Sequence, residues 1–110
     1  EYNHGISGVL KNAIDWASRP DEGEAPMAAF KGKVAGIMSA APGIYGGARG
    51  LWQLRAVLTG VRVLVLPEQL SLSGAAKAFD ADGALQDPQL EAEARGVGAA
   101  LCYILGKLEA

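Results

Sequence analysis

The sequence predicts an α/β fold, in which helices cover both faces of a parallel sheet. Two runs with almost no polar alternation, 34–41 and 61–66, are typical of strands that are buried on both faces. Between them lie a glycine-rich run, 41–47, and a helical pattern over 48–58. A strand, a loop, a helix and a second strand in this order form one crossover unit, which is right-handed in nearly all proteins. We therefore expect a doubly wound sheet whose ligand loops lie at the carboxyl ends of the strands.

A helix is expected before the first strand. Ser7 is a suitable N-cap, and Pro20 ends the helix because the residue before a proline is pushed out of helical geometry. Lys11 and Asp15 are four positions apart and can pair on the wet face. The apolar face recurs at helical spacing, at Leu10, Ala13, Ile14 and Ala17.

The middle helix would turn Leu51, Leu54 and Leu58 inward, and Gly60 suits the left-handed position after its end. After the second strand, Leu70 and Leu72 indicate a short further strand, and 74–78 a turn of helix.

The chain is expected to end in a long helix. Asp87 is its N-cap, and Pro88 occupies the first helical position. An amphipathic stripe follows at Leu90, Ala94, Val97, Leu101, Ile104, Leu105 and Leu108.

Two apolar parallel strands are too few for a sheet of this kind, because their edges stay open and three helices cannot cover them fully. A doubly wound sheet usually has about five strands. We therefore expect the sequence to form the second half of such a domain. Roughly 70–80 upstream residues, or another chain, would complete it.

Composition excludes several classes of function. The 110 residues are 50% hydrophobic and carry a net charge of −2, so they favour a packed core and lack the basic stripe of a nucleic-acid binder. Cys102 is the single cysteine, which fits a reducing cytoplasm, and we expect it in a core or an interface. His4 is the single histidine, so no histidine cluster can bind a metal. No apolar run has the length of a membrane span.

Three motifs in the right order resemble the NADPH-dependent FMN reductase family, which includes quinone, chromate and azo-dye reductases with a flavodoxin-like fold. The first and most specific is Glu1-Tyr2-Asn3 followed by the helix motif over 8–16. The second is Pro42-Gly43 with the Gly-Gly-Ala-Arg run of 46–49. The third is the turn over 79–83 before the last helix.

The resemblance implies a flavodoxin-like doubly wound sheet in three layers, α/β/α, with 1–110 as the C-terminal portion of a single FMN-binding domain. It implies that FMN lies against two loops of this sequence, while the phosphate-binding loop of the family lies upstream. In the family, the opening residues line the isoalloxazine through backbone groups, and the glycine-rich loop lies beside the ring. The residues that match are Glu1, Tyr2, Asn3, Ala41, Pro42, Gly43, Tyr45, Gly46 and Gly47.

The activity implied is hydride transfer from NADPH or NADH to FMN, and from there to a small acceptor such as a quinone, in a cytoplasmic homodimer or homotetramer. The cofactor does this chemistry, so no catalytic acid–base pair is required. A flavodoxin-like electron carrier is the alternative from another class. A truncated, inactive fragment without the phosphate-binding loop is the third reading.

Several residues have a plain structural reading beside the functional one. Gly46 and Gly47 would let the backbone approach a flat ligand, at a helix N-terminus that favours an anionic flavin, or they form an ordinary strand-to-helix turn. Tyr2 and Tyr45 are ring contacts or packing anchors. Arg49, in the first turn of a helix, is opposed by the helix dipole and predicts an acidic partner, with Glu68 of a neighbouring subunit as one candidate.

Overall fold

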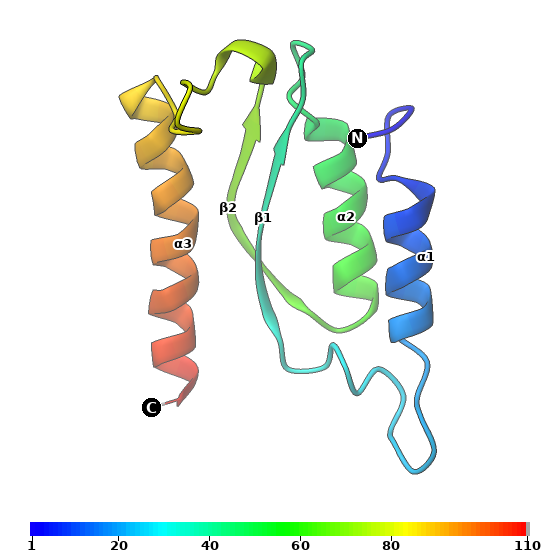
Figure 1. Ribbon diagram of the computed structural model, residues 1–110. Helices are drawn as coiled ribbons and strands as arrows, with labels where there is room; N and C mark the ends of the chain where they lie inside the picture. The colour runs from blue at the N-terminus through cyan, green and yellow to red at the C-terminus, as the bar shows by residue number, and fades with distance from the viewer. Residues whose placement is uncertain (110) are drawn as a thin grey trace.

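The computed structural model describes residues 1–109, which form three layers (Figure 1). The two strands pair in parallel, with α1 and α2 on one side of them and α3 on the other. The predicted α/β/α layering is therefore confirmed for this part of the fold. The elements are α1 (Gly8–Ala17), β1 (Val34–Ala40), α2 (Ala48–Gly60), β2 (Leu64–Leu72), the short 3₁₀ helix η1 (Ala75–Lys77) and α3 (Pro88–Glu109).

The second strand differs from the prediction. It begins at Leu64 rather than Val61, and it continues through Pro67 to Leu72, so the predicted extra strand around Leu70 is the end of β2 itself. The register explains why Pro67 is tolerated. Ala35 pairs with Val65, but Ile37 pairs with Gln69, so three residues of β2 face Gly36 alone. Pro67 lies in this bulge, where its missing N–H removes no regular ladder bond.

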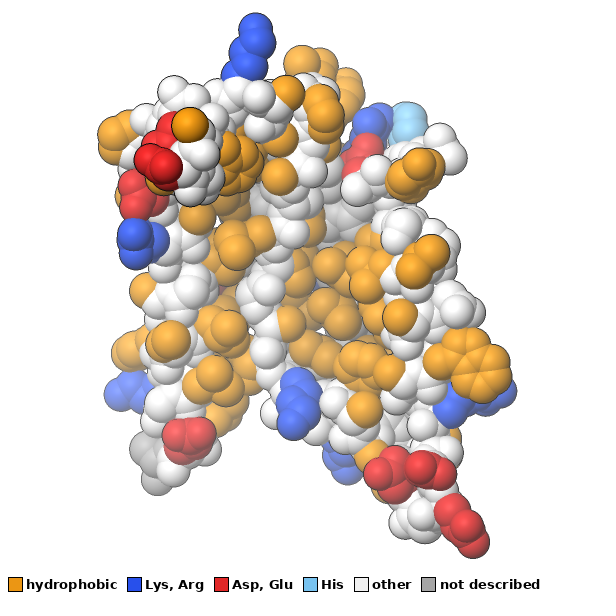
Figure 2. Space-filling model, viewed as in Figure 1, with side chains coloured by type: hydrophobic (Ala, Val, Ile, Leu, Met, Phe, Trp, Pro, Cys, Tyr) orange, Lys and Arg blue, Asp and Glu red, His pale blue; other side chains and the backbone are white. Residues whose placement is uncertain are grey.

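The core lies on both sides of the sheet. Ile14 of α1 packs with Val61 and Val63 near the lower end of α2, and Leu66, Leu70 and Leu72 are buried along β2. On the other side Val97 is the buried residue of α3. A Cβ on Gly36 would lie 2.7 Å from a methyl group of Val97, so the glycine lets α3 approach β1 closely. Hydrophobic side chains accordingly line both sides of the sheet in Figure 2.

The helix ends follow local signals in most places. The Ser7 hydroxyl accepts from the Leu10 N–H, and the Asp87 carboxylate accepts from the Gln89 N–H, as predicted for both N-caps. Gly60 is wrong as the left-handed residue after α2. It is the last residue of the helix, and Arg62 adopts the positive φ of 74° instead. This places Val61 and Val63, on either side of Arg62, in the core.

Several apolar side chains remain exposed in the single chain. Met38 and Leu64 on the strands are 55% and 53% exposed, so the sheet is not covered on both faces by these helices alone. Trp16 and Trp52 are also exposed, which excludes a core role for both within residues 1–109. Cys102 is exposed too, so it lies outside the core that residues 1–109 form.

Candidate functional site

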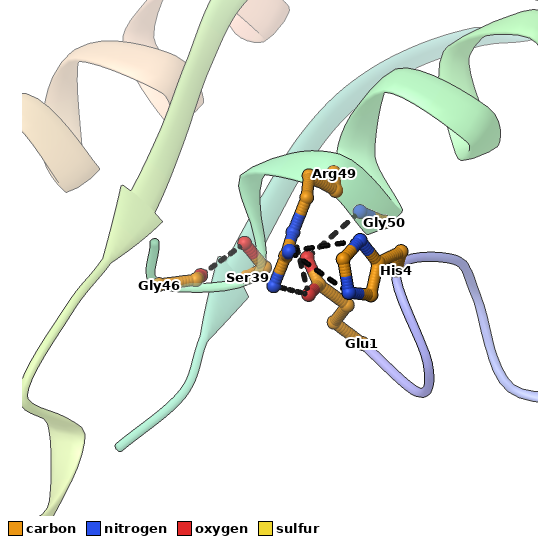
Figure 3. A network of polar contacts seen from close by, with 6 residues as sticks. All are labelled: Glu1, His4, Ser39, Gly46, Arg49 and Gly50. Atoms are coloured by element: carbon orange, nitrogen blue, oxygen red, sulfur yellow. Dashed lines mark hydrogen bonds and ion pairs between the residues drawn. The ribbon is translucent and has the colours of Figure 1, made fainter. Parts of the chain in front are cut away.

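The glycine-rich loop 41–47 connects β1 to α2 at the carboxyl end of the strands. It packs beside the segment that follows β2, because the Ala41 N–H donates to the Leu72 carbonyl at 3.0 Å and the Ala75 N–H donates to the Ala41 carbonyl at 3.1 Å. The Ser39 hydroxyl donates to the Gly46 carbonyl at 2.6 Å and holds the far side of the loop against β1 (Figure 3). The motifs in the sequence do not single out Ser39, and its only signal is a polar side chain within an apolar strand.

The opening residues form a tight two-residue turn. Tyr2 and Gly5 exchange two backbone hydrogen bonds, of 2.7 and 3.0 Å, around Asn3 and His4. Both central residues have positive φ, 47° at Asn3 and 70° at His4. That conformation belongs to the turns that normally select Asn-Gly, and histidine at the second position is strained there.

A polar network joins the opening turn to α2 (Figure 3). One oxygen of the Glu1 carboxylate accepts from Nη2 and Nε of Arg49 at 2.8 and 3.1 Å. Its other oxygen accepts from the Gly50 N–H at 3.1 Å. Nη1 of Arg49 lies 2.9 Å from Nδ1 and 3.1 Å from Nε2 of His4, and the ring nitrogen without a proton accepts this bond. The two predicted ligand loops are therefore brought together.

Glu1 acts as the N-cap that α2 lacks. Gly47 at the cap position has no side chain, and the Glu1 carboxylate supplies the acceptor for the first-turn N–H of Gly50. Partial burial raises the pKa of the Glu1 carboxyl, but the Gly50 N–H and the Arg49 guanidinium outweigh this effect, and the pKa lies below its ordinary value of 4.5. The acidic partner expected for Arg49 is thus Glu1 of the same chain, and a contact with Glu68 of another copy stays a prediction.

The protein itself requires both glycines of the loop. Gly46 and Gly47 are buried and have φ values of 57° and 85°. A Cβ on Gly46 would lie 2.6 Å from the Leu72 backbone, and one on Gly47 would lie 2.7 Å from the Ser39 hydroxyl. The strand-to-helix turn alone therefore explains why both positions are glycine. The hypothesis that the N-terminus of α2 favours an anionic flavin has one N–H donor fewer, because the Gly50 N–H already donates to Glu1.

Other residues of the two loops are open to solvent. Tyr2, Ile44 and Tyr45 are 73%, 84% and 56% exposed, and Pro42 and Gly43 are exposed beside them. Within residues 1–109 no acceptor is paired with the backbone N–H groups of Asn3, His4, Gly43, Ile44 and Tyr45. The Tyr45 ring lies 4.5 Å from the Arg49 guanidinium carbon, as a cation–π pair. The exposed surface therefore combines apolar side chains with free N–H donors.

A cavity of about 160 Å³ lies beneath the opening turn, between α1, β1 and α2. Its walls include Ile6, Leu10, Met38, Ser39, Leu51 and Leu54. Ligand pockets of cofactor size span roughly 300–1,000 Å³, so this hollow cannot hold a flavin.

Two other kinds of site are not found in residues 1–109. No group of three or more His, Cys, Asp or Glu side chains there could hold a metal ion. None of the helices described is both long and apolar enough to cross a membrane.

The chain is similar to several reductases. It is 47% identical over 88 residues to an NAD(P)H-dependent FMN reductase of Pseudomonas aeruginosa, covering 79% of this chain and 45% of that protein. It is 38% identical to an NAD(P)H:quinone oxidoreductase of Solanum tuberosum, covering 99% of this chain and 54% of that protein. The chain thus spans about half the length of the curated relatives it matches.

A solved structure is similar over nearly the whole chain. It is FerB, a flavoenzyme NAD(P)H:(acceptor) oxidoreductase from Paracoccus denitrificans, with 30% identity and a TM-score of 0.78 over 96% of this chain and 57% of that one. The sequence pattern of the family described as NADPH-dependent FMN reductase matches residues 1–77. These residues include both loops of the site, and the chain belongs to the NADPH-dependent FMN reductase family.

Proposed function

We propose that this chain contributes two flavin-binding loops to an NAD(P)H-dependent FMN reductase. The observation that carries the proposal is the ion pair between Glu1 and Arg49, which are 48 positions apart and join the opening turn to the loop–helix junction at one end of the sheet. Ligand sites of open α/β sheets lie at this end.

The exposed groups suit the edge and face of an isoalloxazine ring. The N–H groups of Asn3, Gly43 and Tyr45 are free to donate to its polar edge, and the side chains of Tyr2 and Tyr45 are exposed for contact with its apolar face. The buried Gly46 and Gly47 would set the shape of the loop rather than contact the ring. Glu1 would hold the opening turn, with Ala41 and Pro42 continuing the loop from β1.

FMN, when bound, supplies the hydride chemistry between the nicotinamide and the acceptor. The residues of this chain would bind and orient it, and the apolar rim of Ile44 and Tyr45 would exclude water from one side. The names of the relatives support a quinone as the acceptor. We further propose a cytoplasmic homodimer or homotetramer, for which the exposed Trp16 and Trp52 are available as contact residues.

A titration with FMN tests the proposal most directly. Binding of FMN to the purified protein should quench flavin fluorescence with saturation, and the complex should consume NADPH steadily when a soluble quinone is present. Binding without NADPH consumption would favour the electron carrier. An absence of binding would contradict the proposed function.

Gly43→Val separates a ligand contact from a folding defect. A Cβ at Gly43 meets no protein atom within 4 Å, and its φ is not in the left-handed region, so the substitution should leave folding intact. If this loop lies beside the ring, the added side chain should reduce FMN affinity about tenfold, or 1.4 kcal/mol. Gly98→Ala in α3, also in open space, is the matched control and should leave the affinity unchanged. Equal affinities in all three proteins would place FMN elsewhere.

A further inference from the structure

Arg49 contacts both loops of the proposed flavin site. On one side it binds Glu1 through Nε and Nη2, and His4 through Nη1. On the other side its guanidinium carbon lies 4.5 Å from the centre of the Tyr45 ring. No other side chain described in residues 1–109 binds both the opening turn and the glycine-rich loop by ion pair, hydrogen bond or cation–π contact.

The guanidinium of Arg49 is partly buried and is contacted on several sides. The side chains of Arg49 and Glu1 are 28% and 11% exposed, so this pair is far less open than the Arg95–Glu91 pair, at 79% and 46%. The planar guanidinium offers a fork to the carboxylate and a face to the tyrosine at once, which the point charge of a lysine cannot do. The contact with His4 supports a residue held at a φ of 70°.

We propose that Arg49 is the positioning residue that fixes the opening turn relative to the glycine-rich loop. Through this link the free N–H groups of Asn3 and Gly43 keep one spacing and one orientation. The flavin part of the inference rests on the proposed function. The part that concerns how Arg49 holds the opening turn involves the protein alone and is tested without a ligand.

The test compares three variants with the unsubstituted protein. Arg49→Ala removes the link. Arg49→Lys keeps the charge beside Glu1 but loses the fork and the stacked face. Arg95→Ala is the control, because it breaks an arginine–glutamate pair with the same 2.8 Å contact in α3, far from the loops along the chain. The readouts are amide hydrogen exchange of Gly5, whose N–H bonds to Tyr2 across the turn, exchange in α3, and the Kd for FMN.

We expect Arg49→Ala to speed exchange at Gly5 and to weaken FMN binding, each about tenfold, while exchange in α3 stays unchanged. Arg49→Lys should recover less than half of either loss on a logarithmic scale, whereas Arg95→Ala should change neither quantity. Full recovery in Arg49→Lys would show that charge alone suffices and would overturn the positioning role. So would unchanged exchange and affinity in Arg49→Ala.

The two proposals fail in different ways. If the unsubstituted protein binds no FMN, the proposed function fails, and exchange at Gly5 still decides whether Arg49 holds the turn. If it binds FMN and Arg49→Ala loosens the turn without loss of affinity, the reductase assignment stands and the flavin role of Arg49 is overturned.

Discussion

At the scale of single residues, Glu1 performs two tasks. Its carboxylate caps the N-terminus of α2 through Gly50 and neutralises Arg49, a cation that the helix dipole alone would oppose. The sequence predicted that Arg49 needs an acid but not which one, because the partner lies 48 positions away and is placed by the tertiary fold. The positive φ of His4 could not be predicted from the sequence either, because Asn-His is not a standard signature for a turn with two positive φ values.

The lowered pKa of Glu1 predicts how stability depends on pH. The ionised carboxylate is the form that binds Arg49 and Gly50, so its stabilising contribution is present above its ordinary pKa of 4.5 and is lost as the pH falls through the lower folded value. Glu1→Gln removes this titration. We expect the urea midpoint of the unsubstituted protein to fall more steeply from about pH 6 to about pH 3 than that of the variant.

Glu22→Gln is the matched control for this experiment. Its exposed carboxylate forms no hydrogen bond or ion pair with any residue of the part described, so this substitution removes a negative charge without breaking such a contact. If Glu1→Gln and Glu22→Gln follow the unsubstituted protein equally well, Glu1 is not a significant acid-sensitive contact of this fold.

At the scale of elements, periodicity predicted α1, β1, α2 and α3 because each has a local signal: a capping side chain, an apolar run or a stripe at helical spacing. β2 was predicted too short. Pro67 looks like the end of a strand in the sequence, and only its place in the bulge opposite Gly36 makes it compatible with the ladder. The positive φ of Arg62 was missed for a similar reason, because burial of Val61 and Val63 decides where the chain turns.

Helix α3 contains glycines that local structure does not require. Gly98 and Gly106 lie within it, and a methyl group added at either position would meet no atom within 4 Å. Glycine in a helix interior is less favourable than alanine by roughly 0.5–1 kcal/mol. Gly98→Ala and Gly106→Ala should therefore each raise the free energy of unfolding by about that amount, measured by urea denaturation.

Gly46→Ala is the contrasting case and should destabilise the protein, since its φ is 57° and its Cβ would strike β2.

At the scale of the whole molecule, the site depends on the layers keeping their spacing. The glycine-rich loop leaves the carboxyl end of β1, the opening turn is bound to α2 beside this loop, and both helical layers pack on the same two strands (Figure 1). The resemblance to the reductase family supplied the nine candidate residues, and the fold brings both groups of them to one end of the sheet. It also divides them into exposed residues such as Tyr2 and Gly43, and buried ones such as Gly46, a division that spacing in the sequence cannot reveal.

Gly36 and Val97 provide a test of how tightly the α3 layer is fixed. A Cβ at Gly36 would lie 2.7 Å from a Val97 methyl group, and the stiff, β-branched valine cannot move aside. Gly36→Ala should lower the free energy of unfolding by about 1–3 kcal/mol. Val97→Ala alone removes buried methyl groups and should also destabilise the protein. In the double variant the new methyl group fills the space that Val97 leaves, so the combined loss should be smaller than the sum of the single losses. Strictly additive losses in urea denaturation would mean that α3 shifts freely on the sheet, and that the close approach at Gly36 does not hold this layer in place.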